Sequence, residues 1–127
     1  MTGYVGKIEQ VTLQNTAFRQ VLFTGKHAQL VVMSLLPQEE IGTEVHEAVD
    51  QFFRVESGKA KVVMNGEELT VSDGDAFIVP AGAVHNVINL SVDQSLKLYT
   101  IYSPPNHPAG TIHQTKAEAE AAHDHQN

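Results

Sequence analysis

The stretch GDAFIVPAGAVHNVIN, residues 74–89, carries the pattern that decides the fold. It contains two strand-like runs, the apolar residues 76–79 and the mixed residues 85–89, and each has the length of a β-strand. Pro80 and Gly82 separate the two runs. Proline lacks a donor for the strand ladder and glycine accepts unusual backbone angles, so the chain is expected to turn there. The stretch therefore predicts two short strands joined by a tight connection.

Strand patterns continue on both sides of this stretch. Asn65-Gly66 is the residue pair that best tolerates two positive φ angles, and it separates residues 59–64 from residues 68–71, which predicts a β-hairpin. Further strands are expected at residues 18–24, 29–36, 50–55 and 96–102. Helical periodicity does not interrupt residues 18–102, which argues against a βαβ fold. The sequence therefore predicts an all-β sandwich or closed barrel.

Residues 104–127 differ in character, because they begin with a proline-rich segment that cannot continue a strand. Thr115 and Glu118 match a helix capping box, and the alanine-rich residues after them favour helix. We expect one domain over residues 1–127. Its barrel core covers about 18–103, and the C-terminal extension carries one short helix.

The composition excludes several classes of function. The chain has 127 residues, a formal net charge of −7, seven histidines and no cysteine. The acidic balance argues against nucleic-acid and anionic-membrane partners, since both need clustered Lys and Arg. The lack of cysteine excludes disulfides, thiolate nucleophiles and cysteine-bound zinc or iron–sulfur clusters. The start of the chain lacks the features of a signal peptide, and apolar runs are too short to span a membrane, so we expect a cytoplasmic protein.

The opening stretch resembles the second sequence motif of the cupin superfamily. Gly74, Pro80, Gly82, His85 and Asn89 stand at the family spacing G-x5-P-x-G-x2-H-x3-N. The resemblance implies a small jelly-roll barrel, also called a double-stranded β-helix. Cupins of this size are commonly dimers, so the resemblance also implies a homodimer.

An earlier segment resembles the first cupin motif, G-x5-H-x-H-x3–4-E-x6-G, with substitutions. Counting back from Gly58 places Gln51 where the family has glutamate. His46 then stands at the second histidine position, and Glu44 takes the place of the first histidine. The resemblance thus implies a cupin site with altered ligands.

The residues themselves support a metal site. Glu44 and His46 are two positions apart, so they would share one face of a strand, and Gln51 and His85 could converge with them inside a barrel. Two imidazoles and one carboxylate suit Fe(II), Mn(II), Ni(II) or Zn(II). The alternative is a cupin that kept the barrel and lost the metal. Gln51 could also hold a water molecule or a substrate hydroxyl instead of the ion.

Other aromatic and histidine residues could surround this site. His107 and His113 flank a Pro-Ala-Gly segment that could fold across the barrel mouth. Tyr99 and Tyr102 are three positions apart in a strand, so they should face opposite sides, one in the core and the other able to line the cavity.

Three functions fit these features. In the first, the metal acts as a Lewis acid on a small oxygen-rich molecule, such as a sugar or keto acid, in isomerase or lyase chemistry. The second is an Fe(II)-dependent dioxygenase, and the third is a non-catalytic module that binds or senses a small molecule.

Phe52 and Phe53 must face opposite ways in a strand, and an outward aromatic is compatible with the homodimer that the resemblance implies.

Overall fold

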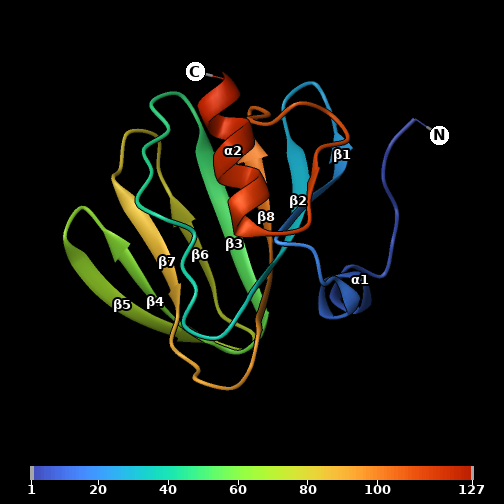
Figure 1. Cartoon of the computed structure of the whole chain (residues 1–127). Coiled ribbons are helices and arrows are strands. Elements are labelled where there is room, and N and C mark those ends of the chain that lie inside the picture. Colours follow the sequence, from blue (N-terminus) through green and yellow to red (C-terminus); the bar gives the residue numbers. More distant parts are fainter. Residues whose placement is uncertain (1, 127) are drawn as a thin grey trace.

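The computed structural model describes residues 2–126, and the side chains of residues 2–122, as two facing antiparallel sheets (Figure 1). The larger sheet has six strands in the order β6-β3-β8-β2-β1-β9, and the smaller has three in the order β5-β4-β7. The elements are α1 (Ile8–Gln14), β1 (Arg19–Thr24), β2 (Gln29–Leu35), β3 (Asp50–Ser57), β4 (Lys59–Met64), β5 (Glu67–Ser72), β6 (Ala76–Val79), β7 (His85–Asn89), β8 (Leu96–Ser103), β9 (Ile112–His113) and α2 (Lys116–Gln126). The expected all-β jelly roll with a short C-terminal helix is confirmed.

The strand positions agree closely with the sequence pattern. Every strand expected from it is present, with bounds that differ by at most two residues. The turn between β4 and β5 has positive φ at Asn65 (47°) and Gly66 (85°), as the hairpin prediction required. Helix α1 and the two-residue strand β9 were not expected.

The core forms where the inward faces of the two sheets meet. Along β8, Leu96, Leu98, Thr100 and Tyr102 are buried, and the residues between them are half-buried. Val62 of β4 is fully buried on the opposite sheet. This alternation is the period-two pattern of a strand with one face on a core. The last two inward side chains of β8 are polar, and this end of the barrel contains the site described below.

Helix α1 lies beside the larger sheet, buries Thr12, and is joined to the sheet by a lysine. The Lys97 ammonium group donates to the backbone oxygen of Asn15, just after the helix, and to Ser34 Oγ at 2.9 Å. Lys7, at the N-cap, makes no side-chain capping bond, which removes the usual sequence signal for a helix start. Contacts with the sheet therefore matter more for this helix than its own sequence.

Helix α2 begins where the capping box predicted. The Glu118 backbone N–H donates to Thr115 Oγ1 at 3.1 Å, and Thr115 N–H donates to Glu118 Oε2 at 3.2 Å. Ala119 is buried and joins the core cluster, so the helix is packed against the barrel. Neither of the two helices found in residues 2–126 is long and apolar enough to cross a membrane.

Asn89, the last residue of the opening motif, fixes the end of β7. Its Nδ2 lies 2.9–3.2 Å from the carbonyl oxygens of Leu35, Leu36 and Gln94, and its Oδ1 accepts from Ser91 N–H at 2.9 Å. The side chain is 1% exposed. One amide thus joins the end of β2 to the loop between β7 and β8.

We expect Asn89→Ala to destabilise the fold by about 2–4 kcal/mol, because it leaves buried backbone groups without partners. Urea unfolding followed by circular dichroism would measure the change. Asn106→Ala, at an exposed position, is the matched control and should change the free energy of unfolding by less than about 0.5 kcal/mol. Equal effects of the two substitutions would contradict the role given to Asn89.

Candidate metal site

The chain before β3 runs antiparallel to β7 and brings Glu44 beside His85. Glu44 N–H donates to the His85 carbonyl oxygen at 2.8 Å, and His85 N–H donates to the Glu44 carbonyl oxygen at 2.9 Å. The expectation that Glu44 and His46 lie within a strand was wrong. Glu44 forms only an isolated bridge, and the nearby Gly42 N–H donates to Asn86 Oδ1 at 2.9 Å instead of to a backbone oxygen of β7.

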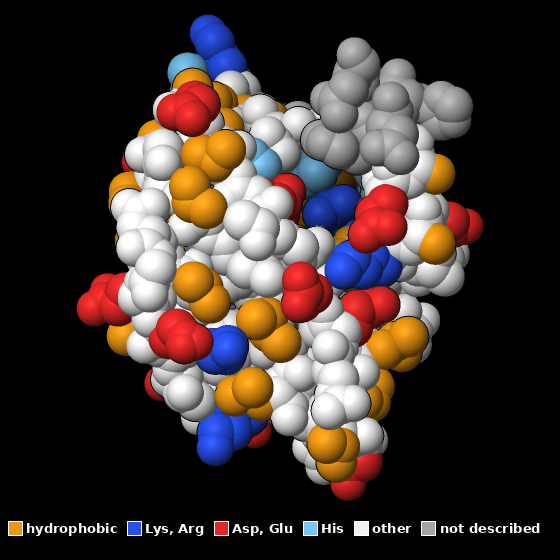
Figure 2. All heavy atoms as spheres, turned by 60° about the vertical axis from the view of Figure 1, so that its left-hand side comes forward, with side chains coloured by type: hydrophobic (Ala, Val, Ile, Leu, Met, Phe, Trp, Pro, Cys, Tyr) orange, Lys and Arg blue, Asp and Glu red, His pale blue; other side chains and the backbone are white. Residues whose placement is uncertain are grey.

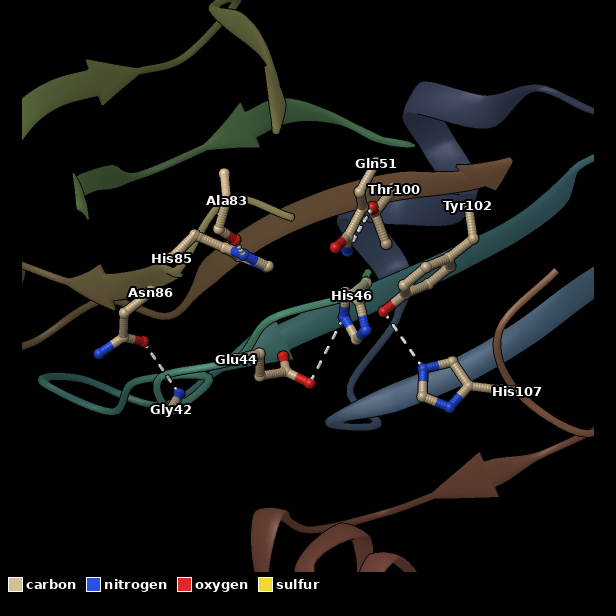
Figure 3. A network of polar contacts seen from close by, with 10 residues as sticks. All are labelled: Gly42, Glu44, His46, Gln51, Ala83, His85, Asn86, Thr100, Tyr102 and His107. Carbon is tan, nitrogen blue, oxygen red and sulfur yellow. Dashed lines mark hydrogen bonds and ion pairs between the residues drawn. The ribbon is translucent and has the colours of Figure 1, made fainter. Parts of the chain in front are cut away.

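Glu44, His46 and His85 nevertheless converge (Figure 3). One potential ligand atom from each of them lies within 4.8 Å of the others. The closest carboxylate–imidazole contact is 3.7 Å, between Glu44 Oε2 and His46 Nε2, and the two imidazole centroids are 5.6 Å apart. The His46 and Glu44 side chains are 13% and 29% exposed, so the cluster can be reached from solvent.

The hydrogen bonds of His85 and Gln51 leave one lone-pair atom free on each. His85 Nδ1 lies 3.0 Å from the Ala83 carbonyl oxygen, so Nδ1 carries the proton and Nε2 keeps its lone pair. Gln51 Nε2 donates to Thr100 Oγ1 at 3.0 Å, which assigns Oε1 to the other side of the amide. His46 Nε2, His85 Nε2 and Gln51 Oε1 are all buried and have no hydrogen-bond partner among the described residues. Figure 3 shows the Gln51 side chain directed toward the two histidines.

The surroundings of His46 favour its neutral form. Burial lowers the pKa of His46 most strongly, the Glu44 carboxylate raises it, and His85 and Arg19 lower it. A neutral imidazole has a lone pair available to a metal ion or to a hydrogen-bond donor. The structure therefore brings together Glu44, His46 and His85, and it directs the Gln51 side chain toward the two histidines.

The comparisons with known proteins identify the family. Residues 31–102 match the cupin domain family. This chain belongs to the cupin superfamily. The match includes all four candidate residues and both motifs of the sequence analysis.

Two similar sequences and two similar structures extend this result. YrkC of Bacillus subtilis, an uncharacterised protein, is 50% identical over 95% of this chain and 68% of its own length. Uncharacterised protein L612 of Acanthamoeba polyphaga mimivirus is 43% identical over 86% of this chain and 70% of its own length. The crystal structure of BH2720 from Bacillus halodurans is 46% identical, with a TM-score of 0.90 and 93% of each chain covered. KdgF from Halomonas sp. is 27% identical, with a TM-score of 0.64 over 69% of this chain and 78% of its own.

Tyr102 and His107 form a further wall of the cupin site, and neither belongs to the two motifs. Tyr102 stands directly opposite Gln51 in the β3–β8 ladder, and its ring centroid lies 5.9 Å from that of His46. Its hydroxyl lies 3.2 Å from His107 Nε2 (Figure 3). Tyr102 and Tyr99 face opposite sides of β8, as expected, but the buried tyrosine is the one that lines the site.

His107 reaches the barrel from the loop between β8 and β9. Gln29 of β2 binds this loop: its Nε2 donates to the His107 carbonyl oxygen at 2.8 Å, and its Oε1 accepts from the backbone N–H groups of Asn106 and His107. His113 lies in β9, paired with Arg19 of β1. Figure 2 shows histidine, acidic and basic side chains gathered in a recess of one face.

Burial raises the pKa of Tyr102 to about 12. The Glu44 carboxylate adds to this rise, and the Arg19 charge and hydrogen bonding from Gln51 and Arg19 oppose it. The unfolded chain would ionise this phenol near its ordinary value of 10.0, so the folded state holds the proton to higher pH. The associated stability is complete below pH 10 and is lost as the pH rises toward 12.

We therefore expect one tyrosine of the folded protein to ionise only near pH 12, as measured by the ultraviolet absorbance of tyrosinate. Tyr102→Phe should remove this late step, and it should reduce the loss of stability between pH 10 and pH 12. Tyr99→Phe, on the outward face of the same strand, is the control and should retain the late step. Loss of that step in Tyr99→Phe alone would show that the assignment is wrong.

Proposed function

We propose that this cupin binds a divalent transition metal ion through Glu44, His46, Gln51 and His85, and acts on a small oxygen-rich molecule in the barrel. The ion would be Fe(II), Mn(II), Ni(II) or Zn(II), since each accepts two imidazoles and a carboxylate. The substrate would be a sugar, a keto acid or a related compound.

The observation that carries the proposal is the set of buried atoms without partners. His46 Nε2, His85 Nε2 and Gln51 Oε1 all lack hydrogen bonds among the described residues. Burying one such atom without a partner costs about 1–3 kcal/mol, and three in one place indicate that something else satisfies them. Two imidazole nitrogens, one amide oxygen and the nearby Glu44 carboxylate support a metal ion as the group that satisfies them.

The chain would prepare the site in two ways. The His85–Ala83 hydrogen bond fixes the tautomer and the ring orientation, as is common for histidines that bind metals. Thr100 accepts a hydrogen bond from the Gln51 amide and itself donates to the Phe52 carbonyl oxygen at 2.8 Å. These two hydrogen bonds connect the proposed ligand Gln51 to the backbone of β3. A divalent ion held by Glu44 as the only anion would keep a net charge of +1 and supply a Lewis acid that polarises a substrate oxygen.

A dioxygenase is the second candidate. Glu44, His46 and His85 supply two histidines and one carboxylate, the set that binds Fe(II) in many non-haem oxygenases. Oxygen consumption by the Fe(II)-loaded protein with keto or catechol substrates would support this function. Stoichiometric nickel, manganese or zinc without oxygen uptake would instead support isomerase or lyase chemistry. Stoichiometric metal without turnover of any substrate would favour a module that binds or senses its ligand.

Substitution of the four residues tests the metal proposal. We expect His85→Ala to remove the metal and leave the barrel folded, as measured by elemental analysis of untagged protein and circular dichroism. Glu44→Gln should weaken metal binding more than Gln51→Ala, because it removes the only charged ligand. Even the smaller of these two losses should exceed about tenfold in metal affinity.

His27→Ala is the matched control for these variants, because His27 is exposed in the turn between β1 and β2. It should retain full metal content. Full metal content in His85→Ala would exclude the proposed ligand set, and equal losses in Glu44→Gln and Gln51→Ala would exclude the ranking of the two. Wild-type protein that takes up none of the four metals would exclude the metal site itself.

We also propose that the protein is a homodimer through an outer patch of the larger sheet, formed by Phe52, Ile78, Tyr99 and Ile101. Phe52 pairs with Ile78 on one side and with Ile101 on the other. The rings of Phe52 and Tyr99 are 6.2 Å apart, and Ile78 is 60% exposed on the edge strand β6. Contiguous apolar side chains on an outer sheet surface favour association.

Ile78→Lys should therefore shift the protein from dimer to monomer, because it places a charge in the apolar patch. Sedimentation equilibrium would measure the mass. Val92→Lys, at an even more exposed apolar residue in the loop between β7 and β8, is the control and should leave the dimer intact. A monomeric wild-type protein would exclude this interface.

A further inference from the structure

Arg19, the first residue of β1, is a buried cation that the proposed metal site does not use. The residue is only 7% exposed, on the inward side of its strand. It takes part in none of the ion pairs found among the described side chains, and its Nε is buried without a hydrogen-bond partner. Its guanidinium carbon lies 5.4 Å from the centre of the Phe18 ring. A charge so deeply buried normally has a carboxylate or another anion beside it.

The charge of Arg19 acts at the candidate site. Its guanidinium group hydrogen-bonds with Tyr102, whose ring centroid lies 5.9 Å from that of His46. In the ladders, Arg19 pairs with Met33 of β2 and with His113 of β9. The inward face of β1 thus delivers a fixed positive charge to the wall that contains Tyr102.

The carboxylate already in the site does not neutralise Arg19. The Glu44 carboxylate lies next to His46, 3.7 Å from its Nε2, where the proposed metal would take it as a ligand. The metal with this one anion keeps a positive charge, so the site would hold two positive centres and no free anion. A neutral ligand such as an uncharged sugar would leave Arg19 without a counter-charge.

We propose that Arg19 is the residue that selects the ligand, and that the ligand is a small carboxylate whose carboxyl group binds Arg19 while another of its oxygens occupies the metal site. The inference rests on the proposed function and narrows its substrate class from oxygen-rich molecules in general to acids. The guanidinium group is suited to this role because its planar fork of donors matches the two oxygens of a carboxylate.

Binding of simple oxo acids and of their methyl esters tests the inference. The probes are pyruvate and levulinate, which differ in the separation of carboxylate and ketone, and methyl pyruvate and methyl levulinate, which lack the charge. Titration of the Zn(II)-loaded protein, followed by NMR, should show that at least one acid binds at least about tenfold more tightly than its ester. Arg19→Met keeps an unbranched apolar side chain and should lose most of this preference. Arg19→Lys should lose part of it, because the charge remains and the paired donors do not.

Arg54→Met is the matched control. The chain has only two arginines, and Arg54 lies on β3, half-exposed and paired with Glu56. This variant should keep the full preference for the acid. Zinc content and thermal unfolding of each variant show whether the metal and the fold are retained. If Arg19→Met does not fold, Arg19→Lys provides the comparison, and an unchanged preference in that variant overturns the proposal.

The outcomes separate this inference from the proposed function. Zinc-loaded protein that binds neither acid better than its ester overturns the role of Arg19 and leaves the metal site standing. Protein that takes up no metal overturns the metal site. An Arg19-dependent preference for the acid in such metal-free protein would still support Arg19 as the anion-binding residue.

Discussion

The two backbone hydrogen bonds between Glu44 and His85 are the constraint on which the rest of the site depends. They join a segment without regular strand structure to β7, and so place both sequence motifs at one point. His46 is anchored in the same way, since its carbonyl oxygen accepts from Gly82 N–H at 2.9 Å. Gly82 has φ of 86°, a conformation that glycine adopts easily, which favours the turn after β6 that presents this N–H. The backbone therefore sets the distances between the functional side chains before any ligand binds.

The interior of the barrel is divided along the strands. On β3 the inward residues run from polar Gln51 to apolar Phe53 and Val55, and β8 runs antiparallel to it, so that its polar Tyr102 stands opposite Gln51. One end of the barrel is thus an apolar core that supplies stability, and the other end is a polar chamber. Polar groups at a buried position need fixed partners, and Thr100, at the boundary between the two regions, supplies one of them.

The sequence predicted the strands well because their signals are local. Turn pairs such as Asn65-Gly66 and the alternation of apolar residues act over a few positions, and the larger fold follows from the motif spacing. Helix α1 was missed because its N-cap residue, Lys7, makes no capping bond and its stability comes from contacts with the sheet. The convergence of Glu44, His46, Gln51 and His85 could be anticipated from the family motifs. The parts played by Tyr102 and Arg19 could not, since they depend on strand register and on the direction of single side chains.

The Gln29 side chain would affect how fast a molecule enters or leaves the polar chamber rather than how tightly it binds. One amide makes three hydrogen bonds to the backbone of Asn106 and His107, and the His107 ring also contacts Tyr102 on the inner wall. Movement of the loop backbone away from the barrel would require the three Gln29 bonds to break. The residence time of an enclosed molecule would then be controlled by a residue on β2 that belongs to neither motif.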